Sequence, residues 1–437
     1  MTKKYFGNCK LFDAKELLNW QKRNCIFYSS SDSLSLDQTK SQNLYRHLYS
    51  KILSCGPISV ADYMKEVLTH PTAGYYMNKD VFGEKGDFTT SPEITQLFGE
   101  MIAIWMVHEK MKFSKCPFQI IELGPGRGTL IKDISRVFKQ LGILNNVSIH
   151  LVEISPALSL IQAQTLCKTT KEHDIKRNES QPTSVTYYRE GLTEDGVTIY
   201  WYYSIKDIPK KFSVFLAHEF FDALPIHKFQ KTDRGWSEVL VDVVEGSTEE
   251  KFRFVLSNAP TPATVYISSD ETRNHVEISP ESLVIIDYIA EHLWECGGVA
   301  LICDYGHNGD RTDTFRAFSQ HKVHDPLSRP GSADLTADVD FAALRKIAEK
   351  DNRLITFGPV TQTSFLKNLG IDVRLQMLLK NATKEDREHL ESGYRMIMDS
   401  DKMGTCFKVL SLFPSIVKDI LQKVPVAGFY SEGKNRI

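Results

Sequence analysis

A glycine-rich turn between a predicted strand and a predicted helix constrains the fold of this chain more than any other feature. Residues 118–123 are mostly apolar and lead directly into Gly124-Pro125-Gly126-Arg127-Gly128. A helical pattern with apolar residues at Leu130, Ile131 and Ile134 follows at once. This order predicts a buried parallel strand, a tight turn and a helix start. Glycines in such a turn let the main chain approach a ligand more closely than a residue with a Cβ atom would allow.

The spacing of the glycines distinguishes between two kinds of ligand. A dinucleotide fingerprint, Gly-x-Gly-x-x-Gly, would place its third glycine at position 129, which is Thr129. The third glycine is instead Gly128, and Glu122 precedes the first by two residues. Glu-x-Gly-x-Gly-x-Gly is the pattern of S-adenosylmethionine (SAM) methyltransferases. We therefore expect Glu122, Gly124, Gly126 and Gly128 to bind SAM or a close relative.

A second acid completes the expected half-site. Residues 147–152 have the pattern of a strand and end directly before Glu153. In nucleotide-binding βαβ units an acid at this strand end accepts hydrogen bonds from the ribose hydroxyls, so Glu153 is a predicted cofactor ligand. The alternative is an ordinary strand, turn and helix whose acids only cap the helix and face solvent.

The composition excludes several other classes of protein. The chain has 437 residues and a formal net charge of −2, so nothing suggests binding to a phosphate backbone. No apolar run of about 18 residues is present, so no membrane insertion is expected. The eight cysteines are scattered without a Cys-x-x-Cys pair, and His321 and His324 are too few to imply a metal site. We expect neither a zinc site nor a disulfide framework.

The N-terminal residues 1–38 differ in composition from the rest of the chain. Over the first thirty residues lysine and arginine outnumber the two acids Asp13 and Glu16, leucines and aromatic residues lie between them, and serines follow. This pattern is typical of a mitochondrial presequence. A disordered tail is the alternative.

The remaining chain alternates predicted strands and helices, which favours a doubly wound α/β sheet. We expect an N-terminal helical region over 39–116 that acts as a lid for substrate or cofactor, a SAM-binding core over 117–413, and a C-terminal tail over 414–437. Successive strands over 226–278 form a β-rich insertion in the core, and helices follow near the C-terminus. The pattern also predicts individual elements. The predicted helices are one broken at Gly56-Pro57 and those over 91–112, 281–295, 340–350, 363–369, 372–380 and 384–399. The predicted strands are 185–189, 197–203, 212–217, 298–303 and 406–413, and polar loops are predicted over 168–184 and 305–340.

Four predicted strands end in acids. These acids belong to the segments 122–128, 153, 218–219 and 304. The carboxyl ends of parallel strands meet at one edge of a sheet, where ligands bind in this class of fold. We therefore expect the four segments to form one site.

A pair of carboxylates follows the strand over 212–217. Glu219 and Asp222 are three residues apart, so both side chains could face one side, with Phe220 and Phe221 beside them. Two fixed carboxylates suit the planar donor fork of a guanidinium group. We expect Glu219 and Asp222 to hold a substrate arginine as catalytic residues. The alternative is that both acids cap a helix and the phenylalanines belong to the core.

The segment Gly86-Asp87-Phe88-Thr89-Thr90 precedes a predicted helix. Free N–H groups at the start of that helix, near Thr90, suit the carboxylate of SAM, and Asp87 suits its amino group. Thr90 and Glu93 also have the spacing of a capping box. An ordinary helix start is the equally weighted alternative.

Together these segments resemble the blocks of the MidA family, whose mitochondrial members are the complex I assembly factor 7 arginine methyltransferases. The resemblance implies a class I SAM-dependent methyltransferase fold. It also implies a mitochondrial matrix enzyme that symmetrically dimethylates an arginine of the 49 kDa-type iron–sulfur subunit of respiratory complex I during assembly. His218 departs from the pattern, where a small polar residue such as Asn is expected. The blocks are Gly56-Pro57-Ile58 and residues 86–93, 122–130, 219–225, 304–306 and 334–341.

Two other functions remain open at this point. One is a non-catalytic assembly chaperone for complex I that keeps the SAM fold, and the other is a methyltransferase for a small molecule. The intact glycine turn and Glu153 favour an enzyme over a chaperone, because a protein that only binds its partner would be free to lose either. The sequence gives neither the target arginine nor the oligomeric state.

Overall fold

The structure is a computed structural model that describes residues 31–77, 90–173, 185–244 and 251–430. The predictions for residues 1–30 of the leader and for Asp87 lie outside the described residues. None of the helices in the described ranges combines the length and the apolar character that a membrane crossing needs.

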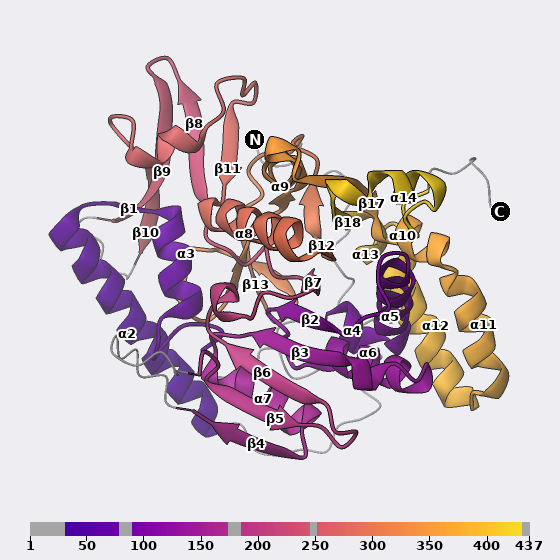
Figure 1. Ribbon diagram of the computed structural model, residues 1–437. Coiled ribbons are helices and arrows are strands. Elements are labelled where there is room, and N and C mark those ends of the chain that lie inside the picture. The colour runs from indigo at the N-terminus through magenta and orange to yellow at the C-terminus, as the bar shows by residue number, and fades with distance from the viewer. Residues whose placement is uncertain (1–30, 78–89, 174–184, 245–250, 431–437) are drawn as a thin grey trace.

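A large mixed sheet forms the centre of the molecule (Figure 1). Its strands run in the order β17-β18-β12-β7-β2-β3-β6-β5-β4. The middle strands pair in parallel, as the alternating sequence pattern predicts. Both edges differ from a wholly parallel sheet, because β18 lies antiparallel between β12 and β17 and β5 lies antiparallel between β6 and β4. The arrangement is a class I methyltransferase fold, and the strands are β2 (Phe118–Leu123), β3 (Val147–Val152), β4 (Thr169–Glu172), β5 (Arg189–Leu192), β6 (Thr198–Tyr202), β7 (Ser213–His218), β12 (Gly298–His307), β17 (Leu354–Thr361) and β18 (Phe407–Pro414).

Helices cover both faces of this sheet. Alternate residues of β2 point to opposite faces, so Ile120 and Ile121 belong to two different apolar clusters. The Ile120 face packs against α5 (Gln96–Met111), α6 (Thr129–Gln140), α7 (Pro156–Leu166), α10 (Gln362–Leu369), α11 (Ile371–Asn381) and α12 (Lys384–Met398). The Ile121 face packs against α8 (Pro280–Cys296) and α9 (Phe341–Ala348).

A second, smaller sheet confirms the predicted β-rich insertion. Its long helix partners are α2 (Ser31–Cys55) and α3 (Val60–Thr69), which join through β1 (Ile58–Ser59). Tyr63 of α3 is fully buried against this sheet together with Val241 and Phe252. The helices therefore share one apolar core with the insertion, whose strands are β8 (His227–Thr232), β9 (Gly235–Val243), β10 (Phe252–Leu256) and β11 (His275–Ile278).

The segment over 305–340 was predicted to be a loop, and this prediction was wrong. It contains a three-stranded sheet of β13 (Arg316–Ser319), β14 (Lys322–His324) and β15 (Asp334–Thr336), followed by β16 (Val339–Asp340). Its strands are short and rich in charged residues, so the apolar alternation that marks a strand is weak. β4 was likewise missed in the predicted polar loop over 168–184.

The single helix predicted over 91–112 is two helices. Thr95 has an extended main chain with φ of −158° and separates α4 (Ser91–Ile94) from α5. The Thr95 hydroxyl accepts a hydrogen bond from the main-chain N–H of Leu97, so this residue caps α5.

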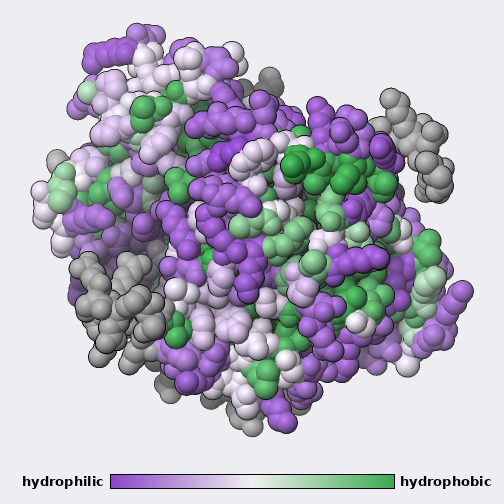
Figure 2. All heavy atoms as spheres, viewed as in Figure 1, coloured by the Kyte–Doolittle hydropathy of each residue, from purple (hydrophilic) through white to green (hydrophobic). Residues whose placement is uncertain are grey.

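The C-terminal residues pack against the core. After η5 (Ser415–Val417) and α14 (Lys418–Lys423), the main-chain carbonyl of Ala427 accepts a 3.1 Å hydrogen bond from the indole of Trp105. Figure 2 shows hydrophilic side chains over much of one face and an apolar patch near α14. Ile416, Ile420 and Val424 are exposed there.

Candidate methyl-donor and substrate site

The glycine turn after β2 has the conformation that its sequence predicts. Gly124, Gly126 and Gly128 have φ of 60°, 54° and 82°, in the left-handed region that favours glycine. A Cβ atom on Gly124 would lie 2.9 Å from the ring of Phe220. Gly128 is the N-cap of α6, so the turn ends where free N–H groups of a helix begin.

Glu122 is buried beneath this turn. Burial raises the pKa of its carboxyl to about 8. Its Oε2 atom has no hydrogen-bond partner among the described residues. A buried, unpartnered acceptor beside a half-buried glycine turn suits a ligand with N–H or O–H donors.

Glu153 at the end of β3 is joined to the glycine turn through one side chain. Its Oε2 accepts a 2.9 Å hydrogen bond from Gln162 Nε2, which also donates to the carbonyl oxygen of Gly126 over 2.7 Å. The other oxygen accepts from the main-chain N–H of Ser155 over 2.7 Å. Burial raises the pKa of Glu153 to about 7, although these hydrogen bonds lower it. The predicted cofactor residues 122–128 and 153 thus lie together.

Glu219 directly follows β7 and has a strained main chain. Its φ of 49° is unusual for a residue with a side chain. Its Oε1 lies 3.6 Å from His218 Nε2, and neither atom has a hydrogen-bond partner among the described residues. Burial lowers the pKa of His218 to about 3, so the imidazole is neutral and the pair is not an ion pair. Burial, and then Asp222, raise the pKa of Glu219 well above its usual range.

Asp222 and Asp304 hold the turn that carries Glu219. Asp304 of β12 is fully buried, and its Oδ2 accepts from the main-chain N–H groups of Phe220 and Phe221 over 3.1 and 2.9 Å. Asp222 Oδ2 accepts from the Thr336 hydroxyl over 2.9 Å. Burial raises the pKa of Asp222 to about 6 and that of Asp304 well above its usual range. The structure therefore brings all four predicted strand ends to one edge of the sheet.

Residues from the small sheet over 316–336 complete the site, and sequence reasoning missed them. Asp334 is buried and accepts a 2.6 Å hydrogen bond from the Tyr76 hydroxyl. Arg316 donates to Asp338 over 2.6 Å and lies 5.9 Å from the centre of the Tyr305 ring. One indication of these residues was present in the sequence, the block over 334–341. This block matches the family pattern, but the match assigns no role to its residues.

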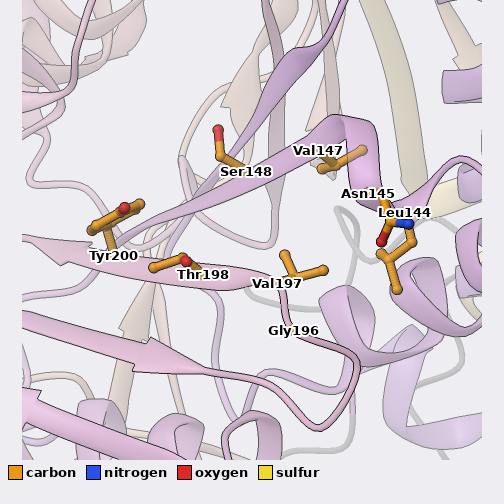
Figure 3. A pocket seen from close by; sticks show the side chains of 8 residues that line it. All are labelled: Leu144, Asn145, Val147, Ser148, Gly196, Val197, Thr198 and Tyr200. Carbon is orange, nitrogen blue, oxygen red and sulfur yellow. The ribbon is translucent and has the colours of Figure 1, made fainter.

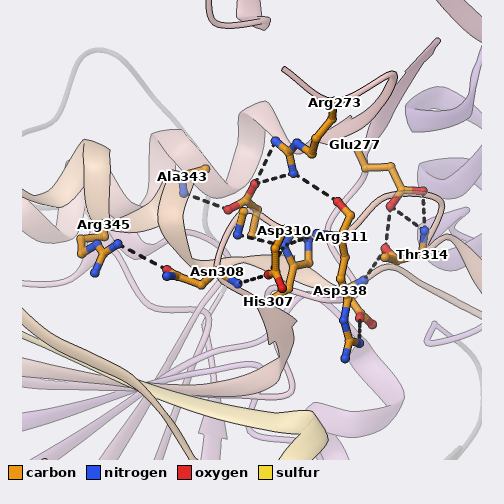
Figure 4. A network of polar contacts seen from close by, with 12 residues as sticks. Arg273, Glu277, His307, Asn308, Asp310, Arg311, Thr314, Asp338, Ala343 and Arg345 are labelled. Atoms are coloured by element: carbon orange, nitrogen blue, oxygen red, sulfur yellow. Dashed lines mark hydrogen bonds and ion pairs between the residues drawn. The ribbon is translucent and has the colours of Figure 1, made fainter. Parts of the chain in front are cut away.

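The β-insertion holds this small sheet in place (Figure 4). Glu277 of β11 accepts hydrogen bonds from the main-chain N–H groups of Thr314 and Phe315 over 2.9 and 3.0 Å. Thr314 Oγ1 in turn accepts from the main-chain N–H of Asp338 over 2.9 Å. The insertion is thereby connected to Arg316 and to the acids of the site.

The predicted capping box at Thr90 is wrong. Thr90 is the N-cap of α4, but its side chain accepts no capping hydrogen bond. Pro92 in the first turn and the adjacent break at Thr95 leave a helix of only four residues. The main-chain N–H of Ser91 donates to the Glu219 carboxylate instead. Contact of Thr90 with a cofactor stays a prediction.

A separate hollow of about 240 Å³ lies at the opposite edge of the sheet (Figure 3). It is lined by residues at the amino ends of β3 and β6, among them Val147, Ser148 and Thr198. It is distant along the strands from Glu153, so it is not part of the predicted site.

Comparison with known proteins identifies the family of this chain and its cofactor. Residues 101–360 match the family model described as "Putative S-adenosyl-L-methionine-dependent methyltransferase". A crystal structure from Burkholderia thailandensis with S-adenosyl-homocysteine bound has the same fold, with a TM-score of 0.70, 22% identity and coverage of 90% of this chain and 96% of that one. These matches, together with the glycine turn, confirm SAM as the cofactor and confirm the resemblance to the MidA family.

Curated relatives cover most of the chain. The human "Protein arginine methyltransferase NDUFAF7, mitochondrial" is 52% identical over 85% of this chain and 83% of its own length. The Drosophila melanogaster homologue is 49% identical over 89% of this chain and 88% of its own. The chain has a glycine turn and acidic strand ends in a class I methyltransferase fold. It belongs to the SAM-dependent methyltransferase family that includes the mitochondrial NDUFAF7 proteins.

Proposed function

We propose that this protein transfers a methyl group from SAM to an arginine side chain of a mitochondrial protein. The observation that carries the proposal is the cluster of buried carboxyls formed by Glu219, Asp222 and Asp304. Arg316 is the cation that approaches Asp222, and it already forms an ion pair with Asp338. Buried acids without matching cations are costly, which suits a site that binds cationic ligands.

The residues on one side of this cluster would hold SAM. Its adenosine would lie against the glycine turn, with Glu153 accepting from the ribose hydroxyls. When bound, SAM supplies an electrophilic methyl group on a sulfonium, and S-adenosylhomocysteine is the product. The positive sulfonium is favoured beside the carboxylates and the ring of Phe220.

The substrate guanidinium fits the other side. Glu219 has an unpartnered Oε1 and a main chain held by a hydrogen bond to Cys303, so its carboxyl has a fixed position. Two carboxylates at the end of β7 can orient the planar donor fork, so that one nitrogen faces the methyl group. The positive charge of the guanidinium favours loss of the proton from Glu219. The methylated guanidinium then loses its surplus proton to solvent or to a nearby carboxylate.

The finer parts of the proposal rest on the family resemblance and on the names of the relatives. We propose the 49 kDa-type subunit of complex I as the protein substrate, symmetric dimethylation as the outcome, and the mitochondrial matrix as the location. The leader over 1–38 would then act as a presequence, and residues 39–116 as a lid over the core of 117–413 with the tail of 414–437.

The test uses a single variant with two measurements. Glu219→Gln keeps the volume of the side chain, so binding of S-adenosylhomocysteine by calorimetry should be preserved. Methylarginine on complex I subunits, measured by mass spectrometry in cells that carry only the variant, should fall to the level of cells without the protein.

A non-catalytic chaperone predicts a different outcome. Cells with Glu219→Gln would then assemble complex I normally, and no methylarginine would depend on the protein. Transfer of labelled methyl groups to a small molecule in mitochondrial lysate would instead indicate the third candidate function.

A further inference from the structure

Two helices outside the methyltransferase site bring three metal-binding side chains together. His47 lies on α2, Glu66 lies on α3, and His70 is the C-cap of α3. One ligand atom from each of the three lies within 4.8 Å of the other two. Figure 1 shows α2 and α3 on the same side of the molecule.

The distances match the geometry of a metal site. His47 Nε2 lies 3.4 Å from Glu66 Oε2. In a tetrahedral zinc site with bonds of about 2.0–2.1 Å, neighbouring ligand atoms are about 3.3 Å apart. The rings of His47 and His70 have centroids 5.1 Å apart and are tilted by 57° to each other, so both imidazoles lie on the same side of the two helices as the carboxylate.

The surroundings orient two of the ligands. Lys51 Nζ donates to Glu66 Oε1 over 2.9 Å, so the other oxygen of this carboxylate faces His47. Thr72 Oγ1 lies 3.4 Å from His70 Nδ1. The main-chain N–H of Thr72 donates to the same nitrogen over 3.4 Å, so Thr72 holds the His70 ring in place.

We propose that His47, Glu66 and His70 bind one divalent transition metal ion of the zinc type. Two imidazoles and a carboxylate are the ligand set of an open zinc site, and they disfavour Mg²⁺ and Ca²⁺, which prefer oxygen ligands. The half-exposed position of His47 leaves the fourth coordination place to water or to a ligand from another molecule. A bound ion would also fasten α2 to α3.

Titration of the full-length, chelator-treated protein with Zn²⁺ tests the site. Calorimetry should give one ion per chain that depends on these residues, and Zn²⁺ should raise the melting temperature. Loss of an outer-shell partner weakens metal binding by about 10–100-fold. His47→Ala and His70→Ala each remove a ligand, so each should weaken Zn²⁺ binding by at least as much. The matched control is His108→Ala, because His108 pairs with Glu109 at 2.9 Å and belongs to no such group of three.

Lys51 supplies a second, independent measurement. Lys51→Gln keeps a hydrogen-bond donor beside Glu66 and removes the ammonium charge that repels a metal ion, so Zn²⁺ binding should tighten. Equal Zn²⁺ binding by the native protein and both histidine variants would overturn the proposal, as would weaker binding by Lys51→Gln. A sulfur charge-transfer band with Co²⁺ that survives in the histidine variants would assign the metal to cysteines and also overturn it.

Discussion

Gln162 donates a hydrogen bond of 2.9 Å to the carboxylate of Glu153. The same amide nitrogen donates to Gly126, and its oxygen accepts from the indole of Trp201 over 2.9 Å. One helical side chain therefore sets the distance between the two parts of the cofactor site, the turn after β2 and the acid after β3.

Removal of this bridge should weaken cofactor binding. Gln162→Leu removes this donor from Glu153 Oε2 and from the Gly126 carbonyl, at a cost of about 1–3 kcal/mol. Calorimetry with S-adenosylhomocysteine should show the loss. Gln119→Leu is the matched control, since Gln119 is another buried amide that bridges Pro209 and Ser213 at the other end of β2. An equal effect of both substitutions on affinity would contradict the bridging role.

Close approach at Gly124 can be separated from main-chain strain. Gly124→Ala and Gly142→Ala both place alanine at positive φ, of 60° and 70°, at a cost of roughly 1–2 kcal/mol. The new Cβ atom in Gly124→Ala would contact the ring of Phe220, whereas nothing lies within 4 Å of the new Cβ atom in Gly142→Ala. Both should lower the melting temperature, and only Gly124→Ala should reduce S-adenosylhomocysteine affinity. Undiminished affinity in Gly124→Ala would exclude the turn from the cofactor site.

Loss of the Asp304 carboxylate should disable the turn that carries Glu219. In Asp304→Asn an amide replaces one oxygen, so main-chain N–H groups of Phe220, Phe221 or Tyr305 lose their acceptor. We expect a loss of about 1–3 kcal/mol in urea unfolding and strongly reduced methyl transfer. Asp287→Asn is the control, because its pair with Arg353 is half exposed and worth little. Native-like activity of Asp304→Asn would show that the turn holds without it.

The stability of the ligand-free protein should fall as the pH rises from about 5 to 8. Folded-state pKa values of about 6 for Asp222, about 7 for Glu153 and about 8 for Glu122 exceed the unfolded values. The folded state then binds more protons than the unfolded state, so stability is fully present below the unfolded pKa and is lost through the folded pKa.

Glu122→Gln isolates one contribution to this pH dependence. It should flatten the fall by up to about 1.4 kcal/mol per pH unit between its unfolded pKa and pH 8. Urea unfolding at several pH values measures the slope. A slope that is unchanged in the variant would mean that Glu122 stays ionised when folded.

The sequence predicts which edge of the sheet carries the site, because each strand is an apolar run with an acid or a glycine turn directly after it. Glu122, Glu153, Glu219 and Asp304 could therefore be placed without coordinates. The parallel pairing of β7 with β12 ends at His218 and Cys303, directly before Glu219 and Asp304, although β12 itself continues to His307.

The residues that cover the site could not be predicted in this way. Tyr76 and Asp334 form a hydrogen bond although 258 positions separate them, and no local pattern links the two. The proximity of His47 and Glu66 could not be predicted either, because it depends on how α2 and α3 pack. Local patterns give elements, whereas contacts between distant segments depend on tertiary packing.

The attachment of Glu277 to Thr314 and Phe315 limits how the insertion can change. Side chains alternate along β11, so a shift of one residue in its alignment with β8 would turn Glu277 to the opposite face. Two amide hydrogens would then lose their acceptor, and the strand with Arg316 would be released. Insertions or deletions should therefore be tolerated at the hairpin tips of this sheet and rejected within β11 itself.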